Sequence, residues 1–195
     1  MRVKMVALVV SYFATFALAT VALDVSPARA AEPTAAGLWQ QINDAGQSEG
    51  WFLIVERNGT YEGVIAKMFL KPGEDPNALC THCTDDRKDK PWLGLPLIRG
   101  MKQHGLNYED GNILDPRNGT VYRALMRLSP DGQTLTVRGF LGFALFGQDQ
   151  TWKRLPDTAM RELDPALRAK YVPASPAPQR PAVRGGSPKA GEASR

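Results

Sequence analysis

Gly111-Asn-Ile-Leu-Asp-Pro-Arg-Asn-Gly-Thr-Val-Tyr122 is a segment in which two turn signals, Asp115-Pro116 and Asn118-Gly119, lie between apolar stretches. An Asn-Gly pair is the strongest local signal for a β-hairpin, because both residues tolerate the positive φ that a type I′ turn requires. The side chain of Asp115 is suited to capping the turn. The segment therefore predicts a strand, a tight turn and a second strand within an antiparallel β meander.

The sequence on either side of this hairpin has the same texture of short apolar stretches separated by turn residues. The candidate strands are residues 37–42, 50–57, 60–69, 107–114, 120–128, 134–141 and 150–155. Turn signals at Asn58-Gly59, Asn118-Gly119 and 129–132 join consecutive pairs of them, which is typical of up-and-down order.

The alternation of side chains predicts which face of each strand is buried, because neighbouring residues of a strand point to opposite sides of the sheet. In residues 120–128 and 134–138, one set of alternate positions is apolar and the other mostly polar. We expect the first set inside and the second outside. The inward set is Tyr122, Ala124, Met126, Leu128, Leu135 and Val137; the outward set is Val121, Arg123, Leu125, Arg127, Thr134, Thr136 and Arg138.

A long curved sheet has to protect its edges, and closure into a barrel removes them. We therefore predict an all-β fold, a small up-and-down antiparallel barrel occupying residues 31–155. Residues 156–171 are predicted to form a short helical segment, with Asp157 as N-cap and an apolar stripe of Met160, Leu163 and Leu167. Pro165 either limits the first turn or starts a second. The segment is expected to pack on the outside of the barrel or across one end.

The two ends of the chain differ in composition from this middle part. Residues 1–30 have a basic start, an apolar run and a small-x-small site ending at Ala30, which predicts a secretory signal peptide. A retained membrane anchor is the alternative, because the apolar run is nearly long enough to span a bilayer. Residues 172–195 are rich in Pro, Ala, Gly, Ser and Arg and are predicted to be disordered. The product is expected in the periplasm or outside the cell, and it meets the membrane only through the leader before cleavage.

The formal net charge does not indicate a basic folded surface. Of the total of +4, the predicted leader contributes +2 and the predicted tail +3, which leaves −1 for the middle of the chain. Nucleic-acid binding depends on clustered cations. We therefore expect no nucleic-acid partner.

Catalytic and metal-binding patterns are sparse in this sequence. Cys80 and Cys83 are the two cysteines, and in an oxidising compartment they are expected to form a disulfide. A redox-active pair is disfavoured, since Asp85 and Asp86 raise the pKa of a nearby thiol. His82 and His104 do not complete a usual zinc spacing. The chain has no Gly-x-Ser-x-Gly elbow, no His-Glu-x-x-His and no phosphate loop. We predict no metal, no cofactor and no enzymatic activity.

Several linked motifs resemble a known bacterial family. They are Gly37-Leu-Trp39, Cys80-x-x-Cys83, Gly94-Leu-Pro-Leu-Ile98, the 111–122 segment, residues 135–142 and Gln150-Thr-Trp-x-Arg154. In this order they resemble the secreted family catalogued as domain of unknown function 2147, over residues 37–155. The resemblance implies a lipocalin-like or fatty-acid-binding-protein-like barrel and no particular activity. Residues 143–149 depart from the pattern, in which a basic residue is expected just after the glycine.

The resemblance also implies a structural role for two residues. In lipocalin-like barrels a Gly-x-Trp on the first strand places an indole across the closed end, and an arginine of the last strand packs over it as a cation on a π face. Trp39 and Arg154 match those positions. We expect this contact to close one end of the barrel.

Two functions remain open. In the first, the chain is an exported, non-enzymatic binding protein for a small apolar or amphipathic ligand. The candidate lining residues are Trp51, Tyr61, Trp92 and Tyr122, with Arg138 as a polar anchor. In the second, the chain is a solid-core protein for envelope interaction or maintenance, with no small-molecule ligand. An eight-stranded barrel can be filled or hollow, so a cavity of about 300 Å³ or more is the feature that separates the two.

Overall fold

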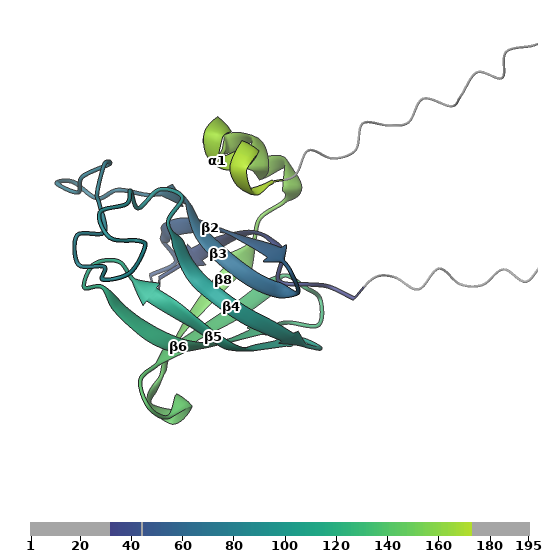
Figure 1. The fold of residues 1–195 in the computed structure, drawn as a ribbon. Helices are drawn as coiled ribbons and strands as arrows, with labels where there is room; N and C mark the ends of the chain where they lie inside the picture. The colour runs from purple at the N-terminus through teal and green to yellow at the C-terminus, as the bar shows by residue number, and fades with distance from the viewer. Residues whose placement is uncertain (1–31, 44, 173–195) are drawn as a thin grey trace, which may run out of the picture. The chain divides into compact units, whose positions relative to one another are not determined.

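A computed structural model describes residues 32–172 except residue 44. The predicted signal peptide, residues 1–30, and nearly all of the predicted tail, from residue 173 onward, lie outside the described residues. Eight antiparallel strands close into a barrel in chain order, with β8 paired to β1 (Figure 1). The strands are β1 Gly37–Ile42, β2 Ser48–Arg57, β3 Thr60–Met68, β4 Pro96–His104, β5 Asn107–Asp115, β6 Thr120–Leu128, β7 Thr134–Phe140 and β8 Gln148–Arg154. The predicted up-and-down barrel is confirmed.

The sequence predicts seven of these strands and misses β4. In this strand Leu97 and Ile98 are buried next to each other, so apolar and polar residues do not alternate. Gly100 then takes a positive φ of 71°, and the pairing of β4 with β5 is interrupted at that point. A strand that bends at a glycine in this way has no period-two pattern that could be detected in the sequence.

The two Asn-Gly pairs form different turns. Asn58 and Gly59 both have positive φ, 52° and 77°, as a two-residue type I′ hairpin requires. In the second hairpin Gly119 has a φ of 76°, whereas Asn118 is not among the residues with positive φ. Four residues, 116–119, connect β5 to β6. The predicted hairpin is present, but the predicted type I′ turn at Asn118-Gly119 is wrong.

The barrel wall separates two apolar clusters. The inner core contains the inward side chains of β6 and β7, as their alternation predicts, together with Trp39, Tyr108 and Trp152. The outer cluster joins outward side chains of β1, β2 and β3 to the C-terminal helical segment; its buried members are Leu38, Trp51, Leu53, Val64, Ala66, Ala159, Leu163, Leu167 and Tyr171. The first three strands are therefore covered on both faces.

The C-terminal segment consists of a 3₁₀ helix, η2 Asp157–Glu162, and a short α-helix, α1 Pro165–Tyr171. Asp157 makes no side-chain cap, so the prediction of that N-cap is wrong. The cap belongs to Asp164, whose carboxylate accepts hydrogen bonds from the backbone N–H groups of Ala166 and Leu167. Pro165 starts the second helix because the first helical position does not need an N–H.

The helical segment packs on the outside of the barrel, one of the two predicted positions. The Tyr171 hydroxyl donates to the Gly94 carbonyl at 3.1 Å, and Arg57 donates to the Lys170 carbonyl at 3.1 Å. Among the described residues, no helix has the length and apolar character needed to cross a bilayer.

Candidate functional site

One end of the barrel is closed by Trp39 and Arg154. The Arg154 guanidinium lies 4.2 Å from the centre of the Trp39 ring. It also donates to the carbonyls of Thr34, Ala36 and Gly132 at 2.5, 2.8 and 2.5 Å. These bonds fasten the segment before β1 and the β6–β7 turn across the end of the barrel. The contact expected between the tryptophan and the arginine is present.

Next to this closed end, two tyrosines form a buried polar pair. Tyr61 and Tyr108 meet edge to face with centroids 4.8 Å apart. The Tyr61 hydroxyl donates to Gln103 Oε1 at 2.6 Å, and the Tyr108 hydroxyl accepts from the Ala35 N–H at 2.8 Å. Burial, assisted by the neighbouring Tyr108, raises the pKa of Tyr61 to about 12. The hydrogen bonds of both phenol groups therefore stabilise the half of the barrel that is filled by side chains.

The opposite end of the barrel holds a cavity of about 860 Å³. Phe52 and Trp152, stacked with centroids 4.3 Å apart and planes 13° from parallel, lie between this cavity and the packed core, and both line it. Ile113 and Tyr122 contribute to the wall from β5 and β6. The cavity is large enough for a small molecule, since ligand pockets occupy roughly 300–1,000 Å³.

Two of the five predicted ligand contacts line this cavity: Trp92 and Tyr122. The other three lie elsewhere. Trp51 is in the outer cluster beneath the helical segment, and Tyr61 belongs to the packed core. Arg138 is on the outer face of β7, where it pairs with Asp149 at 2.5 Å. Trp51 and Arg138 thus lie outside the barrel, and Tyr61 lies inside it but does not line the cavity.

The position of Trp51 shows why residue type is a poor guide to the lining. The side chains of β2 alternate regularly, so that Phe52 points into the inner core and Trp51, its neighbour, into the outer cluster. Phe52 faces Trp39 across the β1–β2 pair and occupies the inner face with it. Strand register, rather than the larger ring, decides which aromatic residue reaches the cavity. Phe52 and Trp152 are the main lining residues that the sequence prediction misses.

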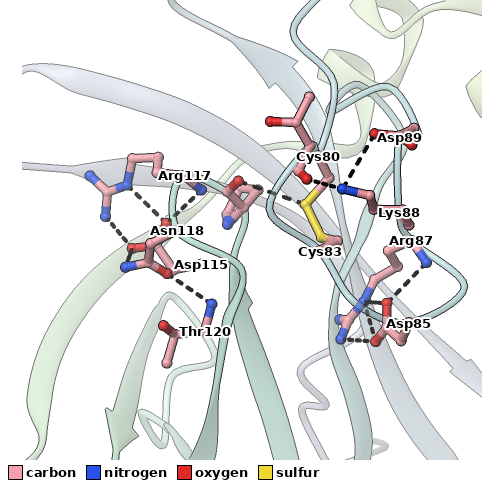
Figure 2. The surroundings of a disulfide bond; sticks show 12 residues. Cys80, Cys83, Asp85, Arg87, Lys88, Asp89, Asp115, Arg117, Asn118 and Thr120 are labelled. Atoms are coloured by element: carbon pink, nitrogen blue, oxygen red, sulfur yellow. Dashed lines mark hydrogen bonds and ion pairs between the residues drawn. A yellow bond between two sulfur atoms is a disulfide. The ribbon is translucent and has the colours of Figure 1, made fainter.

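A long loop, residues 69–95, connects β3 to β4 and forms part of the cavity wall through Ala78 and Trp92. Cys80 and Cys83 are joined by a disulfide within it, and both side chains are buried in the inner core. Figure 2 shows the β5–β6 loop beside this disulfide. The Cys80 sulfur lies 3.7 Å from the Pro116 carbonyl oxygen. The hairpin that identifies the fold therefore docks on the disulfide loop at the open end.

Two arginine–aspartate pairs hold this loop further. Arg87 is buried and donates to both carboxylate oxygens of Asp85 (Figure 2). It also donates to the Pro96 carbonyl at 3.0 Å. Arg99 of β4 makes a bidentate pair with Asp86 at 2.8 and 2.9 Å. In a bidentate pair of this kind, the planar guanidinium forms two parallel hydrogen bonds with the carboxylate. These bonds fix the orientation of both side chains, in addition to the attraction between their charges. The hydrogen bonds from Arg87 lower the pKa of Asp85 to about 2.

This pKa predicts a loss of stability in acid. The pKa of Asp85 is about 2 in the folded chain against an ordinary value of 3.8. Its contribution is thus present above the ordinary pKa and is lost as the pH falls toward 2. The carboxylate is 39% exposed, so solvent screening reduces this contribution to about 1 kcal/mol. Because other carboxylates titrate in both chains, the loss measured by urea unfolding between pH 5 and about pH 2 should be about 1 kcal/mol larger in the parent chain than in Asp85→Asn. An equal loss in Asp85→Asn would contradict the assignment; Asp89→Asn, which alters an exposed pair with Lys88, is the control.

The carboxylates of the open end have structural partners. Asp115 accepts from the Arg117 backbone N–H at 3.0 Å and pairs with its guanidinium at 2.8 Å. The hydrogen bond from the Arg117 side chain is the main cause of the lowered pKa of Asp115. Within the described part of the chain, no three His, Cys, Asp or Glu side chains are grouped as metal ligands. The open end offers a cavity with an aromatic base, a lining of apolar and polar side chains, and a turn-building carboxylate at its rim.

Comparison with known proteins agrees with this architecture. A family model described as an uncharacterized protein conserved in bacteria, DUF2147, matches residues 37–154. The chain is also similar to the solved structure of protein HP1028 from Helicobacter pylori, described as belonging to the lipocalin family. The TM-score is 0.57 at 16% sequence identity, over 68% of this chain and 91% of that one. At this identity the likeness concerns the fold. A comparison with curated proteins found no match.

Proposed function

The chain belongs to the bacterial family DUF2147, and from its lipocalin-like barrel we propose that it is an exported, non-enzymatic protein that binds a small apolar or amphipathic molecule. The observation that carries the proposal is the cavity of about 860 Å³ at the open end. The proposed location, the periplasm or the cell exterior, is supported by the buried disulfide between Cys80 and Cys83, since disulfides persist in oxidising compartments.

The lining of the cavity favours an apolar body for the ligand. Phe52, Ile113, Phe140 and Trp152 present apolar surface to it. Transfer of an apolar molecule from water onto such a surface is favourable by roughly 25 cal/mol for each Å² buried. The stacked pair of Phe52 and Trp152 provides a flat surface at the base of this site.

A polar group on the ligand also finds a partner. Several side chains of the cavity lining carry hydrogen-bonding groups, among them Gln41, Lys71 and Gln150. A polar group that is buried without a partner is costly, so a ligand with a polar group of its own is favoured. This supports an amphipathic molecule over a pure hydrocarbon.

The alternative is a solid-core protein for envelope interaction or maintenance. It requires side chains to fill the whole barrel, and they fill only one half. The half around Trp39, Tyr61 and Tyr108 is filled by side chains. The half above Phe52 and Trp152 holds the cavity, whose volume exceeds the roughly 300 Å³ that a small ligand needs. Binding is therefore the better supported of the two functions.

The polar side chains at the rim build the turn, which supports a non-enzymatic role. Asp115, one of the carboxylates in the cavity lining, is committed to the turn through Arg117, and Asn118 Nδ2 lies 3.4 Å from it. Asn118 Oδ1 in turn accepts the Thr120 N–H at 2.8 Å. These hydrogen bonds explain why Asp115 and Asn118 occur in the turn, and the explanation requires no catalytic role for either residue.

Ligand binding can be tested with a fluorescent fatty acid and with native mass spectrometry of protein purified from the periplasm. We expect saturable binding of the probe or a retained small molecule. The double variant Ile113→Trp/Gln150→Trp places two indoles in the cavity wall and is expected to weaken probe binding at least about tenfold, which is about 1.4 kcal/mol.

The matched control is Leu125→Trp, which changes the outer face of β6 and should leave binding unchanged. Ile113→Trp alone serves if the double variant does not fold. Equal affinity in the cavity variant and the control would place the probe outside the cavity. An absence of both probe binding and a retained molecule would favour the solid-core alternative.

A further inference from the structure

The connection between β7 and β8 is an apolar loop at the open end of the barrel. Residues 140–147 read Phe-Leu-Gly-Phe-Ala-Leu-Phe-Gly and contain no charged, hydroxyl or amide side chain. Four of them are highly exposed: Leu141 at 61%, Phe143 at 77%, Leu145 at 81% and Phe146 at 77%. Single exposed apolar residues are ordinary, whereas a contiguous group marks a contact surface.

This loop has a defined conformation. It contains a 3₁₀ turn, η1 Ala144–Phe146, in which the N–H groups of Phe146 and Gly147 bond to the carbonyls of Phe143 and Ala144 at 3.1 and 3.0 Å. In Figure 1 it is the green turn that projects from the barrel below β6. Arg138 fixes its base, because the guanidinium donates to the Ala144 carbonyl at 3.1 Å while it pairs with Asp149. Backbone groups with partners inside the loop lower the cost of leaving water.

The exposed loop is continuous with the cavity. Leu141 and Phe146 are exposed and also line the cavity, together with Phe140. An apolar surface therefore runs from the tip of the loop into the barrel. A molecule that dissolves poorly in water could follow this surface into the cavity along Leu141 and Phe146, away from the carboxylate of Asp115 on the β5–β6 side of the rim.

We propose that residues 141–146 insert into the surface of a lipid bilayer and so hold the open end of the barrel against the membrane. The purpose of the contact rests on the proposed binding function, because the bilayer is then the phase from which the apolar ligand enters. Insertion itself depends only on the loop. Association through one short apolar turn is weak and reversible, since binding strength scales with the apolar area that enters the interface.

A second copy of the chain fits this loop less well. The four exposed side chains offer about 500 Å² in total, taking roughly 150–250 Å² for a whole aromatic side chain. A stable protein interface buries about 800 Å² on each partner. A projecting turn of this size suits a fluid apolar phase, which can surround it on all sides.

The test places an environment-sensitive dye on the loop tip of the full chain. Phe143→Cys supplies the only free thiol, because the two native cysteines are joined to each other. With vesicles of phosphatidylethanolamine and phosphatidylglycerol, or of phosphatidylcholine, the dye emission should shift to the blue and be protected from aqueous quenchers. The same dye on Gln133→Cys, at the closed end where the Gln133 carbonyl accepts from the Arg154 N–H, should not respond. A silent dye at residue 143, or an equal response at residue 133, would overturn the proposal.

A second measurement separates the loop from ligand binding. Phe143→Ser/Leu145→Ser should lower the vesicle partition coefficient at least about tenfold while the affinity for fatty acid without vesicles and the unfolding midpoint stay unchanged. Leu79→Ser, at a position that is 44% exposed in another loop, is the matched control and should leave partitioning intact. Unaltered partitioning of the double variant would refute loop insertion even if the cavity binds its ligand. Concentration-dependent self-association that the double variant abolishes, with no response of the dye to vesicles, would assign the loop to a second copy instead.

Discussion

Replacing Gly119 with alanine should lower the free energy of unfolding by about 4 kcal/mol, a size found when a special backbone position or a packed core is disrupted. Gly119 has a φ of 76°, which costs a residue with a Cβ about 1–2 kcal/mol. That Cβ would also overlap the His82 carbonyl oxygen and lie 2.6 Å from the carbonyl carbon. These are backbone atoms beside Cys83, so no side-chain rotation relieves the clash. The hairpin and the disulfide loop would have to separate.

Gly59→Ala is the matched control for this experiment. Gly59 has nearly the same φ, 77°, and no atom lies within 4 Å of the position that its Cβ would take. The substitution should therefore lower the free energy of unfolding only by the cost of the positive φ, about 1–2 kcal/mol. Urea unfolding of both variants measures the difference, which is the contribution of the docked loop. Equal losses would show that the contact between Gly119 and His82 does not stabilise the fold.

The two glycines also show what the sequence can and cannot predict about the hairpins. Asn58-Gly59 and Asn118-Gly119 are identical dipeptides, and both predict hairpins, which are present. The first turn is determined locally and keeps the type I′ conformation. The second is shaped by contact with residues 82 and 83, far away in the sequence. A local pattern predicts that the chain reverses there, and tertiary contacts decide how.

The same distinction separates the predicted from the missed parts of the site. Alternation along β6 and β7 correctly places Tyr122 and Val137 on the inner face. Trp51 does not reach the cavity because β2 is buried on both faces, its outer face being covered by the C-terminal segment, so the sequence of β2 offers no polar set that marks the outward positions. Trp92 reaches the cavity from a loop with no periodic pattern, and residue type alone suggests it. Strands with one polar face are therefore predictable, and the irregular connections that complete the cavity are not.

Arg154→Met is expected to cost about 4 kcal/mol, because three carbonyl oxygens lose a charged donor at once. The guanidinium joins Thr34, Ala36 and Gly132 and packs on the Trp39 ring. Methionine can replace the packing of the side-chain stem and none of the hydrogen bonds. The fit around this group is close, since a Cβ at Gly37 would lie 2.5 Å from Arg154 Nη1.

Two further variants separate the hydrogen bonds of Arg154 from its charge and its ring contact. Arg154→Lys retains the charge but not the planar fork, so its loss of stability should be intermediate. Arg123→Met removes a similar contact, in which the guanidinium lies 5.3 Å from the centre of the Phe140 ring on the exposed side of β6. An exposed cation–π contact is worth about 0.5–1 kcal/mol, so this control should change stability little. If Arg154→Met cost no more than Arg123→Met, the closed end would be held by the packing of Trp39 alone. A difference of about 3 kcal/mol would instead show that the arginine fastens the first and last strands across the base of the barrel.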